Sequence, residues 1–214
     1  MHPMSRLVLF DIGGVLIRIR TWDRALRAGG LSAARCSDLL PRLGELEKLW
    51  MDFENGDCDW PAFQGLLQSR FQLSSEESEA CAFAVLDKAF PGSAELVDEL
   101  RRGGLHLGTL SNTNAFHWGH MASGSGPFRL PIDGFEFPFT SFQIRELKPG
   151  PEIYAAAEKL SGHAPSSIAF FDDRAENVRT ALDRGWCAER IDPDGSRPPA
   201  QQIRSHLRRW GWIG

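Results

Sequence analysis

The sequence predicts an α/β protein with a three-layer core around a parallel sheet and an inserted helical-bundle cap. Short, wholly apolar segments alternate with helical ones along most of the chain, as is typical of parallel strands covered on both faces. The exception is a long segment after the first strand, where apolar residues recur at helical spacing and strand character is almost absent. We therefore expect a Rossmann-like core of residues 1–16 and 91–214 and a cap of residues 17–90.

Local patterns predict each core element. The first strand, Leu7–Phe10, is an unbroken apolar run. Residues 135–142 are rich in strand formers, but Pro138 restricts this segment to the sheet edge or to two short pieces. Residues 124–134 predict a loop, and Pro151 lies near the first position of a helix. The other predicted strands are Leu105–Leu110, Ile168–Phe171 and Ala188–Ile191, and the other core helices are Ala94–Arg102, Phe116–Met121, Glu176–Arg184 and Gln201–Trp210.

Turn and capping residues divide the cap into separate helices. Asp59, followed by Pro61, predicts one helix start, and Ser74–Glu77 has the pattern of a capping box at another. Residues 54–57 predict a turn. Three aromatic residues of this region are best interpreted as packing within the cap: Trp50, Phe53 and Trp60.

Composition restricts the class of partner. A net charge of −4 argues against a nucleic-acid binder that relies on a basic face. No apolar run approaches the roughly 20 residues of a membrane span, and the N-terminus runs into the first strand without a separate signal-peptide region. The four cysteines are widely spread, so we expect free thiols in a reducing cytoplasm. The oligomeric state is left open.

Polar residues follow three of the predicted strands. Asp11 comes after the first, Ser111-Asn112 after the second, and Asp172-Asp173 after the third, while Lys148 lies at a helix entrance. If these strands are neighbours, the carboxylates converge and need a compensating cation, for which Mg²⁺ is the usual partner. A hydroxyl, backbone N–H groups and a lysine beside that cation would bind a phosphoryl group, and a carboxylate could act as nucleophile.

These motifs resemble those of the haloacid dehalogenase superfamily. They are Asp11-x-Gly13-Gly14-Val15, Ser111-Asn112, Lys148-Pro149 and Phe171-Asp172-Asp173-x-x-x-Asn177, in the order of that superfamily. The helical insert resembles its C1 cap, and the resemblance places residues 54–57 near the active site. The segments FDIGGVL, FENGD, LSNTNAFH and KPGPEIY are more narrowly similar to small sugar-phosphate phosphatases. That branch includes bacterial α-glucose-1-phosphate phosphatases and is related to the phosphatase domain of soluble epoxide hydrolase.

The resemblance implies a role for each motif residue. Asp11 would attack phosphorus and form an aspartyl-phosphate, while Ser111 and the Asn112 backbone would bind the phosphoryl oxygens. Lys148 would neutralise developing charge and orient the nucleophile.

The same resemblance implies a magnesium site. Mg²⁺ would lie between Asp11, the Gly13 carbonyl and Asp173. Asp172 and Asn177 would shape the metal environment and its loop.

One position departs from the superfamily pattern. Most of its phosphatases have a second Asp, a general acid and base, where this chain has Gly13, and such catalysis is typically worth about 10²–10⁴-fold. A sugar 1-phosphate, which has a good leaving group, would need less protonation. Alternatively, His117 or a water near Asp172 could supply the proton; His117 is therefore included among the candidate phosphate-binding residues. A third explanation is that catalysis has been lost.

The residues thus predict a Mg²⁺-dependent phosphatase acting on a small phosphorylated metabolite, with a sugar phosphate as the leading candidate. One alternative is a metal-independent 2-haloacid dehalogenase, which also lacks the second Asp. The paired acids Asp172-Asp173 favour the phosphatase, because only a metal site needs them. The other alternative is a non-catalytic protein that binds a ligand or partner. The spacing His117-x-x-His120 could be read as a zinc site, but no third ligand is evident.

Overall fold

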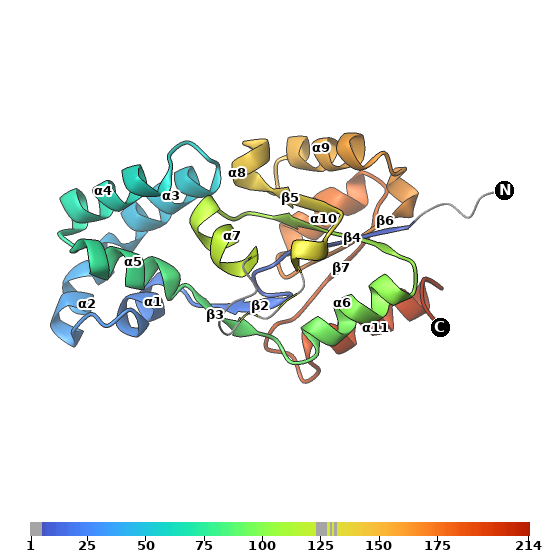
Figure 1. The fold of residues 1–214 in the computed structure, drawn as a ribbon, viewed down its shortest axis with the longest axis horizontal. Coiled ribbons are helices and arrows are strands. Elements are labelled where there is room, and N and C mark those ends of the chain that lie inside the picture. The colour runs from blue at the N-terminus through green and yellow to red at the C-terminus, as the bar shows by residue number, and fades with distance from the viewer. Residues whose placement is uncertain (1–5, 123–127, 129, 131) are drawn as a thin grey trace.

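The computed structural model describes residues 6–122, 128, 130 and 132–214. A sheet with helices on both of its faces forms one part of the molecule, and a group of helices, α1 to α5, forms the other (Figure 1). Most of the predicted loop at 124–134 lies outside the described residues.

The central sheet is parallel throughout, with the strand order β5-β4-β1-β6-β7. Its first strand lies in the middle and is wholly buried. Strand β5 contains Pro138 and lies at an edge, which is one of the two arrangements predicted for that segment. The strands are β1 (Leu7–Phe10), β4 (His106–Ser111), β5 (Phe137–Thr140), β6 (Ile168–Asp172) and β7 (Cys187–Arg190).

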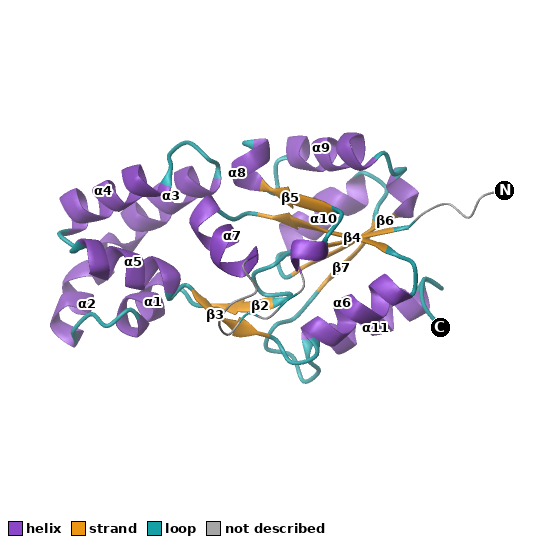
Figure 2. Ribbon diagram, viewed as in Figure 1, coloured by secondary structure: helices purple, strands orange, loops and turns teal. Residues whose placement is uncertain are grey.

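Helices cover both faces of this sheet, as Figure 2 shows. Because side chains alternate along a strand, Val8 and Phe10 belong to one apolar cluster and Leu7 and Leu9 to another. The first cluster includes residues of α6 (Ser93–Arg102) and α11 (Pro199–Arg209), and the second includes residues of α9 (Pro151–Ser161) and α10 (Ala175–Asp183). The predicted three-layer α/β fold is therefore confirmed. The shorter core helices are α7 (Ala115–Ala122), η2 (Ile132–Gly134), α8 (Ser141–Ile144) and η3 (Pro165–Ser167).

Residues 22–83, called the helical lobe below, pack around an apolar cluster of their own. Asp59 caps one of the helices by accepting from Ala62 N, and Ser74 and Glu77 form the predicted capping box. Trp50 packs edge-on against Phe53, as expected for the lobe interior. The helices are α1 (Trp22–Ala28), α2 (Ala33–Leu39), η1 (Leu40–Arg42), α3 (Leu43–Glu54), α4 (Trp60–Phe71) and α5 (Ser75–Phe83).

A two-stranded antiparallel ribbon connects the lobe with the core. It pairs β2 (Ile17–Ile19) with β3 (Leu86–Ala89), in a region where the sequence pattern predicted helices and almost no strand. Strands of three and four residues are too short to show a two-residue period, which is why sequence analysis missed them. The boundaries of core and cap remain a prediction.

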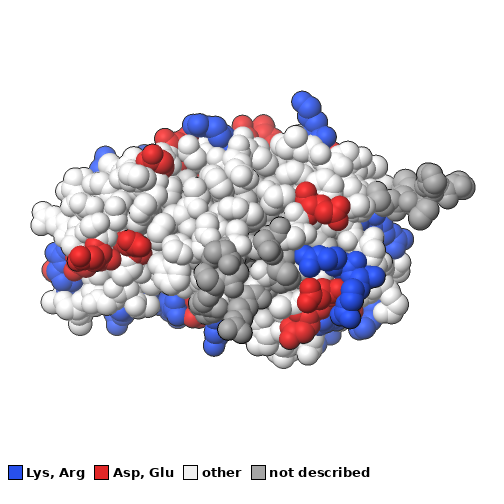
Figure 3. Space-filling view, in the orientation of Figure 1, with Lys and Arg blue, Asp and Glu red and all other residues white. Residues whose placement is uncertain are grey.

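Charged side chains of both signs lie on the face shown in Figure 3. On the described part of the face in Figure 3, Lys and Arg side chains lie in small groups near Asp and Glu. Within the described ranges, no helix is both long enough and apolar enough to cross a membrane. The four cysteines are free thiols.

Candidate active site

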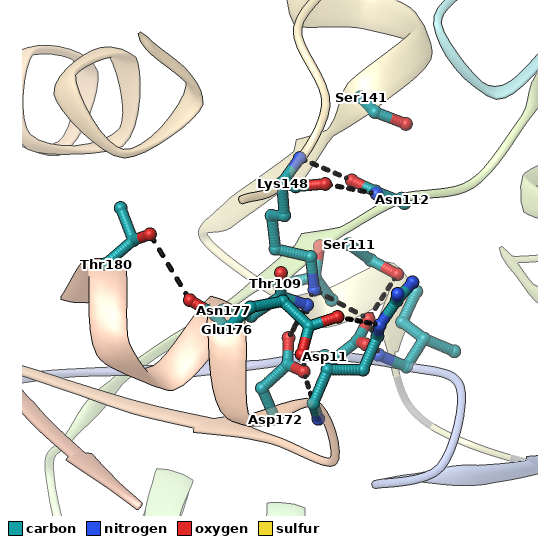
Figure 4. A network of polar contacts seen from close by, with 12 residues as sticks. Asp11, Thr109, Ser111, Asn112, Ser141, Lys148, Asp172, Glu176, Asn177 and Thr180 are labelled. Atoms are coloured by element: carbon teal, nitrogen blue, oxygen red, sulfur yellow. Dashed lines mark hydrogen bonds and ion pairs between the residues drawn. The ribbon is translucent and has the colours of Figure 1, made fainter. Parts of the chain in front are cut away.

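The predicted residues meet at the carboxyl edge of the sheet. Strand β1 pairs with β4 on one side and with β6 on the other, so the ends of all three strands open at the same place. Asp11 follows β1, Ser111 is the last residue of β4, and Asp172 is the last residue of β6 (Figure 4). Sequence analysis predicted that these polar residues converge if their strands are neighbours. The strands are neighbours, and the residues lie together.

Asp11 is buried and held through one of its two oxygens. Oδ1 accepts hydrogen bonds from Ser111 Oγ and from the backbone N–H of Ile12, both at 2.7 Å, and lies 3.1 Å from Lys148 Nζ. Among the described residues, every hydrogen bond to this carboxyl group reaches Oδ1, which leaves Oδ2 open to a ligand. Burial raises the pKa of Asp11 to about 7, although the charge of Lys148 opposes this shift.

Lys148 places a buried positive charge between two carboxylates. Its Nζ lies 2.6 Å from Asp172 Oδ2, and its side chain is 1% exposed. Burial opposes its charge, but Asp11 and Asp172 outweigh that effect and raise the pKa of Lys148. Asn112 fixes the backbone of Lys148, because its Oδ1 accepts from Lys148 N at 2.9 Å and its Nδ2 donates to Lys148 O at 3.0 Å. The sequence analysis assigned a role only to the backbone of Asn112, whereas the structure shows that its side chain also positions Lys148.

Both carboxylate oxygens of Asp172 make contacts with neighbouring residues. Asn177 Nδ2 donates to both of its oxygens, at 2.9 and 3.0 Å, and Arg174 N donates to Oδ1 at 2.8 Å. Tyr154 donates its hydroxyl to the carbonyl of Asn177 and so anchors this loop to the core. Asn177 therefore holds Asp172, which in turn contacts Lys148; the predicted role of these two residues in shaping the metal environment stays a prediction.

The acidic side chains fit a magnesium ion. Carboxylate oxygens of Asp11, Asp172 and Asp173 lie within 4.8 Å of one another. Burial, together with the nearby Asp172, raises the pKa of Asp173, so negative charge at this point is incompletely compensated. Gly14, at φ +75°, lies so close that a Cβ there would be 2.5 Å from Asp173 Cγ. Hard oxygen donors with uncompensated charge are what Mg²⁺ prefers, and the backbone of Gly13 lines the same pocket.

A small pocket of about 170 Å³ opens over these residues. Most of its lining comes from the core, but Ile19 belongs to the ribbon and Glu54 to the helical lobe. The complete lining is Asp11, Gly13, Ile19, Glu54, Asn112, Lys148, Asp173, Arg174 and Asn177.

Comparison with known proteins identifies the family. A model of haloacid dehalogenase-like hydrolases matches residues 5–183. The chain belongs to this family. The resemblance seen in the four motifs is thereby confirmed, and so is the prediction of a hydrolase.

Relatives of this hydrolase cover nearly its whole length. A D-ribitol-5-phosphate phosphatase of Bacteroides thetaiotaomicron is 26% identical over 207 residues, which are 94% of this chain and 97% of the relative. A family enzyme of the same organism, solved with magnesium and inorganic phosphate, has a TM-score of 0.76 and 23% identity, covering 90% of this chain and 96% of that one. An L-2-haloacid dehalogenase of Xanthobacter autotrophicus has a TM-score of 0.61 and 22% identity, covering 88% and 78%. Both structures share the fold.

His117 does not reach the pocket of this hydrolase. It is 4% exposed, its Nε2 lies 2.8 Å from the carbonyl of Ala82, and its ring lies 4.9 Å from that of Trp50. Burial lowers its pKa to about 4. The predicted role of His117 in binding phosphate or supplying a proton therefore conflicts with its position. Helix α7 turns the ring toward the helical lobe, where it joins the two parts of the molecule.

Two polar residues of the pocket had no predicted role. Arg174, whose side chain pairs with Glu176 at 2.7 Å, falls on an unspecified position within the fourth motif. Glu54 lies at the end of α3, in the segment that the family resemblance placed near the site. That resemblance placed its segment near the site but gave the Glu54 side chain no role.

Proposed function

We propose that this protein hydrolyses a small phosphomonoester by way of an aspartyl-phosphate on Asp11, with Mg²⁺ as cofactor. The arrangement of Asp11 carries the proposal. Its Oδ1 is held by Ser111 and Lys148, its Oδ2 is open, and Asp173 lies beside it. A carboxylate oriented in this way can attack an electrophile in the pocket without first losing conformational freedom.

The first step transfers the phosphoryl group to the protein. Asp11 attacks phosphorus as the bond to the ester oxygen breaks, and negative charge develops on the transferred group. Ser111 Oγ and Lys148 Nζ, which flank the nucleophile, supply a donor and a positive charge there. Mg²⁺, held by Asp11, the Gly13 carbonyl and Asp173, would neutralise further charge on the phosphoryl oxygens. Water then cleaves the aspartyl-phosphate and restores Asp11.

A sugar phosphate or sugar-alcohol phosphate is the proposed substrate class. The relative that acts on D-ribitol 5-phosphate supports it, and a pocket of about 170 Å³ suits a phosphoryl group with a short polyol. We propose that the helical lobe serves as the cap over this pocket, because it contributes Glu54 to the lining. We also propose a cytoplasmic location, since a reducing compartment would keep the free thiols reduced.

The geometry favours this chemistry over halide displacement. A metal-independent dehalogenase has no use for Asp173, a carboxylate beside Asp11 whose charge the described residues leave incompletely compensated. Divalent-cation chemistry explains the position of that side chain.

Phosphate release from a panel of sugar and sugar-alcohol phosphates and p-nitrophenyl phosphate tests the proposal. The panel is assayed with Mg²⁺ and with chelator, for the wild type and for Asp11→Asn. We expect Mg²⁺-dependent release that is lost in the variant. Release of chloride from 2-chloropropionate without Mg²⁺ would instead support the dehalogenase. A folded, Mg²⁺-binding protein without turnover would support the non-catalytic alternative.

A further inference from the structure

Gly13 leaves this site without the second aspartate on which acid–base catalysis would rest. Within the described pocket lining, three residues have carboxyl groups: Asp11, Glu54 and Asp173. Asp11 is the nucleophile of the proposed reaction and Asp173 is a metal ligand. Glu54 remains, and it enters the pocket from the helical lobe, on a different element from the nucleophile.

The position of Glu54 is fixed from both parts of the molecule. Its Oε1 accepts a hydrogen bond from Trp50 Nε1 at 2.8 Å, one helical turn earlier. Its carbonyl accepts from Ser141 Oγ at 2.6 Å, and the same hydroxyl accepts from the backbone N–H of Thr113 at 2.9 Å, two residues after β4. The turn that follows packs on the core so closely that a Cβ on Gly56 would lie 2.5 Å from the Phe142 carbonyl. The carboxyl group is thus held at the pocket.

The surroundings of Glu54 favour its protonated form. Burial raises its pKa to about 8, although the N–H of Trp50 opposes the shift. The charge of Asp11 adds to this effect, whereas Lys148 and Arg174 oppose it. A carboxyl group with a proton to give near neutral pH is what protonation of a leaving alkoxide requires. The hydrogen bond from Trp50 uses Oε1, so the proton can reside on Oε2 of this pocket-lining residue.

We propose that Glu54 is the general acid and base of this enzyme, in place of the residue that Gly13 lacks. As Asp11 attacks and the ester P–O bond breaks, Glu54 gives its proton to the leaving oxygen, and an alcohol departs. The Glu54 carboxylate then takes a proton from the water that attacks phosphorus, while the bond from phosphorus to Asp11 breaks. Phosphate leaves, and both carboxyl groups return to their initial state. This inference rests on the proposed phosphatase function.

The test compares two leaving groups in Glu54→Gln. An alkyl phosphate such as D-ribitol 5-phosphate needs a proton on its leaving oxygen, whereas nitrophenolate departs without one. We expect kcat/KM to fall about 10²–10⁴-fold for the alkyl phosphate and less than about tenfold for p-nitrophenyl phosphate. Because the second step also loses its base, the variant should release a burst of nitrophenolate before slow turnover. Glu47→Gln, an exposed glutamate on the same helix, is the matched control.

A second variant distinguishes loss of the carboxyl group from a structural effect of the substitution. Glu54→Asp retains a carboxyl group and should keep more alkyl-phosphate activity than Glu54→Gln. Equal losses of kcat/KM on both substrates in Glu54→Gln, or no loss on either, would overturn the role of Glu54. A wild-type protein that hydrolyses neither substrate with Mg²⁺ would overturn the phosphatase function itself, and the proposal for Glu54 with it.

Discussion

Replacing Lys148 by methionine would leave two buried carboxylates without the cation that lies between them. Lys148 Nζ is 3.1 Å from Asp11 and 2.6 Å from Asp172, and the side chains of Lys148 and Asp172 are 1% and 0% exposed. Methionine preserves most of the apolar stem, so the change removes mainly charge. Breaking a buried ion pair by removing one partner costs about 3–5 kcal/mol, because the remaining charge is uncompensated.

The stability lost in Lys148→Met should be greater at higher pH. Burial already raises the pKa of Asp11 in the folded protein, and Lys148 opposes that rise, so the pKa of Asp11 in the folded variant should lie further above that in its unfolded chain. The folded variant therefore binds more protons than the unfolded one, and its free energy of unfolding falls as pH rises toward the raised pKa of Asp11. We expect the free energy of unfolding to fall further below that of wild type at pH 8 than at pH 6. Mg²⁺ should reduce the difference in unfolding free energy between the variant and wild type, because a bound cation would also neutralise Asp11.

Urea unfolding at both pH values, with and without Mg²⁺, measures these differences. Lys159→Met, which removes an exposed lysine from α9, is the control and should stay within about 0.5 kcal/mol of wild type. Turnover of p-nitrophenyl phosphate should fall about 10²–10³-fold in Lys148→Met, because a positive charge beside the transferred group is lost. The reasoning is refuted if Lys148→Met is as stable as the control at pH 8 and retains turnover.

Three further substitutions, one of them with a matched glycine control, test the buried histidine and the metal site. His117 has a folded-state pKa of about 4 against an ordinary value of 6.5, so its contribution to stability is present above pH 6.5 and is lost as pH falls toward 4. Between pH 7 and pH 5, wild type should lose about 2 kcal/mol more unfolding free energy than His117→Gln in urea titrations, and equal losses would contradict the buried neutral ring. Gly14→Ala and Gly104→Ala both force alanine to positive φ, at +75° and +76°, but open space surrounds Gly104. Thermal melts should show about 1–2 kcal/mol of lost stability in both, while calorimetry should show lost Mg²⁺ binding in Gly14→Ala alone. Asp173→Asn should weaken Mg²⁺ binding at least about tenfold by calorimetry, and unchanged affinity would remove Asp173 from the metal site.

Short local patterns were enough to predict the sheet and most of the residues that meet at its carboxyl edge. Asp11, Ser111 and Asp172 each end or follow an apolar strand, so parallel topology brings them together once the strands are neighbours. Lys148 was also placed correctly, because it comes just before a helix that begins with proline.

The direction in which a helix presents a given side chain could not be predicted from local sequence patterns. His117 comes soon after the second motif, which suggested the pocket, but α7 directs its ring to the carbonyl of Ala82. The family resemblance placed the segment of Glu54 near the site, but the side chain is positioned by contacts with Trp50 and Ser141 that no local pattern reveals.

In the proposed reaction Asp11 accepts the phosphoryl group. The most direct measurement is acid quenching of the enzyme during turnover of p-nitrophenyl phosphate with Mg²⁺, followed by peptide mass spectrometry. We predict one phosphoryl group on the peptide that contains Asp11, none in Asp11→Asn, and more in Glu54→Gln because its second step is slow. Turnover of wild type without this adduct, or turnover that persists in Asp11→Asn, would contradict the account.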